Sequence, residues 1–243
     1  MRSLGIIAAR GGSKGVPRKN LTTLSGIPLI EFTRRAAAGS RLDKVIVSTD
    51  DVEIADVARS IGLEVPFIRP SELSGDGSSL SSVLIHAVDE MAAMGERFDI
   101  VMSLDITAPF KLSGDIDECL DRFEQGATSA NTVCEAEINP YFNMLKLDSQ
   151  GWAEPLFEEY FTLTRRQDAP TVYRENAVVQ ATTVEQLRAG NWPVTDQCSL
   201  VVMETRRSFM IDSSEDLLMV QATAKQFLDK YYDCSMGDSA EHE

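Results

Sequence analysis

Short apolar runs recur along the first half of the chain and alternate with segments of a different hydrophobic pattern. Residues 4–9, 44–48 and 99–104 are mostly apolar, and each run leads into a polar or glycine-rich loop. Runs of this length are typical of strands that are buried on both faces. We therefore predict three strands in this part of the sequence.

Segments of helical period lie between these runs. In 54–61 and 79–94 the apolar residues recur at steps of three and four, and Gly62 and Gly95 mark the helix ends. Residues 28–38 predict a further helix with a proline in its first turn. The alternation of strands and helices predicts a three-layer αβα fold of the α/β class, with a mainly parallel, Rossmann-like sheet.

The pattern changes between residues 135 and 173, where helical period is weak. The aromatic residues of this stretch include Tyr141, Phe142, Trp152, Phe157, Tyr160 and Phe161. Hairpins that leave the main sheet fit the pattern, and aromatic side chains outside a core indicate a partner surface. The alternative is a long excursion that packs against its own domain.

Strand-like runs return at 177–182 and 199–204, and apolar periodicity predicts a last helix at 217–231. The sequence thus divides into a main domain, a protruding hairpin subdomain that would serve dimerisation, and a polar tail expected to be disordered. These parts are residues 1–134 with 174–232, residues 135–173, and residues 233–243.

The formal net charge of −15 argues against binding to nucleic acid or to an anionic membrane. No apolar run reaches the length of a membrane span or a signal peptide, so we expect a cytoplasmic protein. The four cysteines have no zinc-site spacing, and two histidines leave little room for a histidine general base. A small anionic substrate would need a local basic pocket within this acidic chain.

Such a pocket is indicated by residues 6–20, IIAARGGSKGVPRKN, in which a buried strand opens into a basic glycine-rich loop. Its glycines would let backbone N–H groups turn toward phosphate oxygens, and its cations would offset their charge. The spacing fits neither the P-loop nor the Rossmann dinucleotide fingerprint. A glycine turn with solvated lysines is the alternative reading.

The same run resembles the opening motif of the acylneuraminate cytidylyltransferase family, which makes CMP-activated sialic and related nonulosonic acids. Five further segments resemble motifs of this family in the expected order: 44–58, 66–79, 107–110, 164–177 and 210–217. The resemblance extends over nearly the whole chain. It implies a nucleotidyltransferase sheet, and a reaction in which the anomeric hydroxyl of an α-keto sugar acid attacks the α-phosphate of CTP and releases pyrophosphate.

The resemblance also implies roles for individual residues. The nucleotide would be held by Arg10, Ser13, Lys14, Lys19 and Asn20, with Arg10 and Lys14 as the catalytic cations. Base and ribose would be flanked by Arg69 and Asp76, the pocket floor would include Thr107, and the sugar would be met by Arg166, Gln167 and Arg174. Asp212 would bind Mg²⁺, whose preferred ligands are hard oxygens. By the same analogy the enzyme would be a homodimer.

The sequence departs from the family pattern at four positions. Met210 stands where a second metal-binding aspartate is usual, Asp105 replaces a glutamine, Ala177 replaces the glycine after Asn176, and Lys111 replaces an arginine. We count Asp105 and Asn176 among the substrate-binding residues. One hypothesis is that Asp105 restores the carboxylate lost at Met210; the alternatives are a contact with nucleotide or sugar, or a cap on the next loop.

Two other functions stay open. One is a cytidylyltransferase for a 3-deoxy-octulosonate sugar, although its Gln-Gly-Asp-Glu-Pro loop differs from Asp-Ile-Thr-Ala-Pro at 105–109. The other is a homologue that binds nucleotide or sugar without catalysis, which Met210 favours and the intact basic loop opposes. Within the nonulosonic acids, the segments 107–110 and 158–168 lean toward the pseudaminic type.

Overall fold

The computed structural model of the chain describes residues 1–12, 18–75 and 77–231, and its centre is a six-stranded sheet. The strands follow the order β10-β6-β9-β5-β1-β4. They are β1 (Ser3–Ala9), β4 (Lys44–Thr49), β5 (Ile100–Leu104), β6 (Ser129–Glu135), β9 (Tyr173–Thr183) and β10 (Cys198–Val202). The pairs β1–β4, β1–β5 and β6–β10 are parallel, and β9 runs antiparallel to both of its neighbours.

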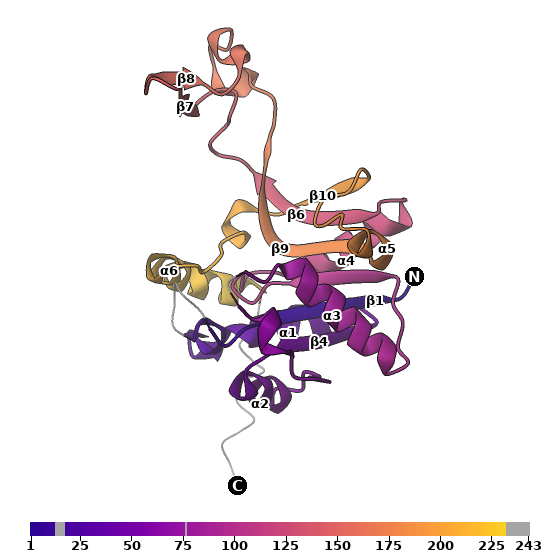
Figure 1. Cartoon of the computed structure of the whole chain (residues 1–243). Coiled ribbons are helices and arrows are strands. Elements are labelled where there is room, and N and C mark those ends of the chain that lie inside the picture. The colour runs from indigo at the N-terminus through magenta and orange to yellow at the C-terminus, as the bar shows by residue number, and fades with distance from the viewer. Residues whose placement is uncertain (13–17, 76, 232–243) are drawn as a thin grey trace.

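Helices cover both faces of this sheet (Figure 1). They are α1 (Leu29–Ala38), α2 (Val52–Ser60), α3 (Leu80–Ala93), α4 (Ser113–Glu124), α5 (Val184–Arg188) and α6 (Ser214–Tyr231). One core cluster joins α1, α2, α4 and α6 to one face, and a second joins α3 and α5 to the other. Neighbouring residues of β1 divide between the two, Ile7 in the first and Ile6 in the second, because successive strand side chains point to opposite faces. The predicted three-layer α/β fold is confirmed.

Most expected elements are present. The three early strands correspond to β1, β4 and β5, and the predicted helices correspond to α1, α2, α3 and α6. Ser79 caps α3 by accepting a hydrogen bond from the Ser82 N–H at 3.2 Å. The later strands correspond to β9 and β10, although β9 begins earlier than expected. The sequence reading missed α4, β6, the short α5 and a small hairpin of β2 (Thr23–Leu24) and β3 (Ile27–Pro28).

The segment between β6 and β9 extends away from the main sheet (Figure 1). It carries a separate two-stranded hairpin of β7 (Leu145–Leu147) and β8 (Ala153–Pro155). Asn139 fastens the base of this segment, because its Nδ2 donates to the Pro170 carbonyl at 2.9 Å. The apolar side chains Leu147, Trp152 and Phe161 are each more than two-thirds exposed there.

Within the described residues, none of the helices combines the length and the apolar character that a bilayer crossing needs. The predicted disordered tail, 233–243, lies outside the described residues.

Candidate active site

A polar hollow of about 260 Å³ opens where β1 and β5 end. Because β5, β1 and β4 are parallel, their carboxyl ends meet at one edge of the sheet, which is where open α/β sheets bind ligands. Six of the predicted site residues line this hollow: Arg10, Lys19, Asn20, Arg69, Asp105 and Thr107. The structure thus gathers segments that lie almost one hundred positions apart in the sequence.

The basic loop leaves β1 along the end of β4. The Gly11 N–H donates to Asp50 Oδ1 at 3.1 Å, and a Cβ at Gly11 would come within 2.6 Å of the Asp51 carboxylate. Glycine is therefore required for this close approach. Asp51 itself caps α2 by accepting the N–H groups of Glu53 and Ile54. The predicted residues Ser13 and Lys14 fall outside the described residues.

Arg69 is buried, with 4% of its surface exposed, and is held on three sides. Its Nη1 donates to the Ser48 carbonyl at 3.1 Å, its Nε donates to Ser74 Oγ at 3.1 Å, and its Nη2 lies 3.5 Å from Asp50 Oδ1. Burial lowers the pKa of the guanidinium, and Asp50 opposes that shift. Asp50 thereby connects Arg69 to the glycine loop. Asp76, predicted on the same side, falls outside the described residues.

Asn20 and Lys19 hold the far end of the loop. The Asn20 side chain is buried and donates to the Arg10 carbonyl at 2.8 Å, so it connects the end of the loop to its beginning. Lys19 Nζ lies 2.9 Å from Asp212 Oδ1, and 68% of the Asp212 side chain is exposed. A predicted phosphate-binding cation and the predicted metal carboxylate therefore meet directly.

The loop after β5 forms the opposite wall. Asp105 Oδ1 accepts the Thr107 N–H at 2.6 Å, and the Thr107 carbonyl accepts the Ile211 N–H at 2.9 Å. The first contact is a cap on the loop, one of the alternatives considered for Asp105. A metal contact by this carboxylate stays a prediction.

Lys111 is fully buried beneath this loop. Its Nζ donates to Thr33 Oγ1 at 2.8 Å, to the Ala108 carbonyl at 2.7 Å and to the Asp105 carbonyl. Three acceptors match the three N–H donors of an ammonium group. Burial lowers the pKa of Lys111 to about 8, although the carboxylates of Asp105 and Asp115 act in the opposite direction.

The residues predicted to meet the sugar lie elsewhere. Arg166 and Gln167 line a separate hollow of about 400 Å³ at the base of the protruding segment. Arg174 lies on β9, where it is exposed and Nη2 lies 3.2 Å from Cys134 Sγ.

Asn176 is buried, and its amide is occupied within the protein. It accepts from Thr132 Oγ1 and from the Val178 N–H, and it donates to Ser208 Oγ at 2.9 Å. A sugar contact by Asn176 stays a prediction, although this structure gives the residue an internal role instead.

Sequence reasoning overlooked Asp50 and underrated Lys111. Asp50 was not singled out in the sequence, yet its position directly after a parallel strand is a signal for a site residue. Lys111 was recorded only as a substitution, and its burial could not be read from the residue type, because lysine is rarely buried.

Asp212 would offer a metal an accessible carboxylate at this site. Asp212 is exposed toward solvent, whereas Met210 packs in part against the main core. In the described part of the chain, three or more His, Cys, Asp or Glu residues are nowhere grouped for metal binding. An exposed hard-oxygen donor fits Mg²⁺ when phosphate oxygens and water supply the remaining ligands.

Comparisons with known proteins agree with this arrangement. A family model described as Cytidylyltransferase matches residues 4–228. The chain is 30% identical over 221 residues to the pseudaminic acid cytidylyltransferase of Campylobacter jejuni subsp. jejuni serotype O:2, covering 89% of this chain and 94% of that protein. It is 31% identical over 218 residues to the CMP-N,N'-diacetyllegionaminic acid synthase of the same organism, covering 88% and 92%.

A solved structure of CMP:2-keto-3-deoxy-manno-octonic acid synthetase complexed with CTP has the same fold. It aligns with a TM-score of 0.67 at 17% identity, over 93% of this chain and 99% of that one. The match over residues 4–228, together with the hollow at the strand ends, assigns this chain to the cytidylyltransferase family.

Proposed function

We propose that this protein transfers CMP from CTP to the anomeric hydroxyl of a nonulosonic acid of the sialic, pseudaminic or legionaminic type, and releases pyrophosphate. The observation that carries the proposal is the hollow at the ends of β1 and β5, in which Arg10, Lys19 and Arg69 gather inside a chain of net charge −15. A polyphosphate is the kind of ligand that such a cationic hollow attracts. The two relatives named above act on nonulosonic acids.

In the proposed reaction the sugar hydroxyl oxygen forms a bond to the α-phosphorus, and the bond from that phosphorus to the bridging oxygen of pyrophosphate breaks. The hydroxyl proton leaves to solvent. Negative charge grows on the phosphate oxygens, so placement and charge neutralisation matter more than a nucleophilic side chain. Arg10 and Lys19 line the hollow and would supply the positive charge that neutralises these oxygens, together with Lys14 of the same loop.

Mg²⁺ is proposed as the cofactor, held by Asp212 together with phosphate oxygens. When bound, the metal would neutralise charge on the triphosphate. Asp212 lies beside Lys19, so the carboxylate and the cation would approach the triphosphate from one side.

A homodimer is proposed for the assembly. Arg166 and Gln167 lie at the base of the protruding segment and line a hollow of their own, apart from the residues that line the nucleotide hollow. The hairpin beyond them exposes Leu147 and Trp152, and exposed apolar side chains of this kind mark interaction surfaces. A second copy that covers the hairpin could bring Arg166 to its partner's nucleotide site. A cytoplasmic location is part of the proposal, since CTP is available there.

The proposal is tested by pyrophosphate release from purified protein with Mg²⁺, each of the four NTPs, and a panel of nonulosonic and octulosonic acids. Release that requires CTP and one nonulosonic acid, with the mass of the CMP-sugar, is the expected result. Release with the octulosonic acid alone would transfer the assignment to that sugar class. Binding of CTP without release by any pair would favour a non-catalytic protein.

The shared site has its own test. Lys19→Ala and Arg166→Ala proteins are each expected to be inactive, and a mixture refolded together is expected to recover about a quarter of wild-type activity, because half of the dimers are mixed and each has one intact site. A mixture that stays inactive would contradict the exchange of residues between copies.

A further inference from the structure

The segment that joins β10 to Asp212 has little regular structure of its own. Between Met203 and Asp212 it holds one short 3₁₀ turn, Thr205–Arg207. Backbone hydrogen bonds anchor it near its two ends, from the Met203 N–H to the Val133 carbonyl at 2.7 Å and from the Ile211 N–H to the Thr107 carbonyl at 2.9 Å. The second bond joins the segment directly to the wall of the nucleotide hollow.

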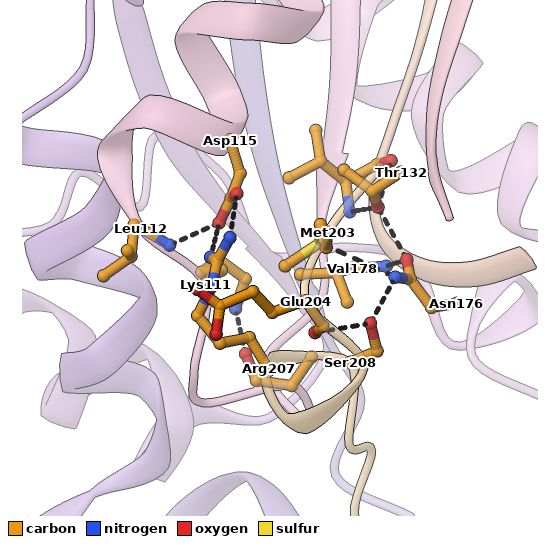
Figure 2. A network of polar contacts seen from close by, with 12 residues as sticks. Lys111, Leu112, Asp115, Thr132, Asn176, Val178, Met203, Glu204, Arg207 and Ser208 are labelled. Atoms are coloured by element: carbon orange, nitrogen blue, oxygen red, sulfur yellow. Dashed lines mark hydrogen bonds and ion pairs between the residues drawn. The ribbon is translucent and has the colours of Figure 1, made fainter. Parts of the chain in front are cut away.

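Arg207 joins this segment to α4 through a bidentate side-chain contact with Asp115 (Figure 2). Its Nη1 and Nη2 lie 2.5 and 2.9 Å from the two carboxylate oxygens of Asp115. Both side chains are close to nine-tenths buried, at 11% and 8% exposure. A buried bidentate pair of this kind fixes both distance and orientation.

Asp115 belongs at the same time to the loop that forms the hollow. Its Oδ2 accepts the Leu112 N–H at 2.8 Å and so caps the start of α4, directly after the loop that carries Asp105 and Thr107. Arg207 therefore binds the end of this loop through Asp115, while the Ile211 N–H binds the loop nearer its start, at the Thr107 carbonyl. In Figure 2, dashed lines run from the Asp115 carboxylate to the Leu112 N–H and to the Arg207 guanidinium.

A second set of contacts steadies the same segment from the sheet. Ser208 Oγ accepts from Asn176 Nδ2 at 2.9 Å, and Asn176 in turn accepts from Thr132 Oγ1 at 2.7 Å (Figure 2). This network positions Ser208 and reaches the start of the loop through Val178, whose N–H donates to Asn176 and whose carbonyl accepts the Asp105 N–H at 3.2 Å. The ion pair of Arg207 with Asp115 adds a direct side-chain link between the two walls.

We propose that Arg207 is a positioning residue for Asp212: paired with Asp115, it locks the segment 203–212 against the loop 105–112 and so places the Asp212 carboxylate beside Lys19. Four residues separate Arg207 from Asp212, and the backbone of Asp212 is fixed further by the Asp216 carboxylate, which accepts its N–H at 3.1 Å. The role of Asp212 in binding a metal on the triphosphate rests on the proposed function. The rigid attachment of the segment 203–212 to the loop 105–112 does not depend on that function.

The experiment compares wild type with Arg207→Met and Asp115→Asn, using two readouts besides turnover. The first is amide hydrogen exchange at Ile211, followed by NMR. Loss of the pair should speed this exchange at least tenfold while the amides of β1 stay protected. The second is calorimetric titration with CTP with and without Mg²⁺. The variants should lose about tenfold in the Mg²⁺-dependent part of the affinity, as partners of a metal ligand commonly do, and keep metal-free CTP binding.

Arg41→Met is the matched control, because Arg41 also pairs with α4, through Asp117 and Asp121, but on the exposed surface. It should change neither readout. If Arg207→Met does not fold, Arg207→Lys and Asp115→Asn carry the test, with the lysine variant intermediate.

Unchanged Ile211 exchange, or equal loss of CTP binding with and without metal, would overturn the positioning role. A wild type whose CTP binding ignores Mg²⁺ would refute the metal part of the proposed function and leave the exchange readout to decide on the lock.

Discussion

Lys111 is a buried cation, and its replacement by methionine is expected to change how stability depends on pH. The folded protein holds the pKa of this lysine at about 8, against 10.5 for an ordinary lysine. Between these values the folded protein has released the proton and the unfolded chain still binds it. Stability contributed by this group therefore rises with pH across that window.

The magnitude follows from the same shift. A lowering from 10.5 to about 8 corresponds to about 3 kcal/mol, at about 1.4 kcal/mol for each pH unit. Below pH 8 the lysine is charged in both the folded and the unfolded protein, and it no longer contributes to the change of the unfolding free energy with pH. Methionine cannot titrate, so the unfolding free energy of wild type minus that of Lys111→Met should grow by most of this amount, about 2.5 kcal/mol, between pH 7 and pH 10.

The assay is urea unfolding at a series of pH values from 7 to 10, followed by tryptophan fluorescence. Because the other titrating groups are common to both proteins, the difference isolates Lys111. Lys44→Met serves as the control, since Glu96 and Glu64 raise the pKa of Lys44 and its proton stays bound throughout the series. Lys111→Arg, which keeps its charge, should show the same missing slope as the methionine variant. A wild-type-minus-variant difference that stays constant with pH would refute the reasoning.

Further predictions concern the glycine loop, β9 and the hairpin. Gly11→Ala should weaken CTP binding at least tenfold by calorimetry, because its Cβ would meet the Asp51 carboxylate at 2.6 Å. Gly12→Ala should change it less than threefold, because no atom of the described residues lies within 4 Å of a Cβ at that position. Ala177→Gly should raise the unfolding free energy by about 1 kcal/mol in urea, because Ala177 has a φ of 51°. Trp152→Glu should shift the dimer toward monomer in analytical ultracentrifugation, because that ring is 71% exposed on the proposed interface.

Sequence reasoning found the elements whose buried residues are apolar and recur in the sequence at the period of a strand or a helix. The strand β6 escaped because its buried residues include Ser129, Asn131 and Thr132, which are polar side chains that make hydrogen bonds inside the fold. The helix α4 did carry a signal, since Ile116, Cys119 and Phe123 recur at helical steps. Its many charged residues hid that stripe.

The site likewise contains residues that the sequence pattern predicts and contacts that it does not. The phosphate-side residues could be predicted because they follow strand ends and stand in a recognisable motif. Contacts between distant segments could not, because neither Asp115 nor Arg207 differs in the sequence from an ordinary surface charge. The conformation of Ala177 was likewise invisible: the glycine usual in the family suits a positive φ, and the structure keeps that φ with alanine.

The replacement of a carboxylate by Met210 changes what the rest of the site must do. Asp105 stays a candidate to restore the lost charge, and its Oδ1 also accepts the Thr107 N–H at 2.6 Å and so contributes to the loop. Asp212 contacts the basic loop through Lys19. If Asp212 is the metal carboxylate, as proposed, Mg²⁺ would also need phosphate oxygens and water, and its affinity would depend on where Asp212 lies relative to the triphosphate. A rigid link between the two walls, such as the pair of Arg207 with Asp115, would therefore matter more for this proposed metal than it would with two carboxylates.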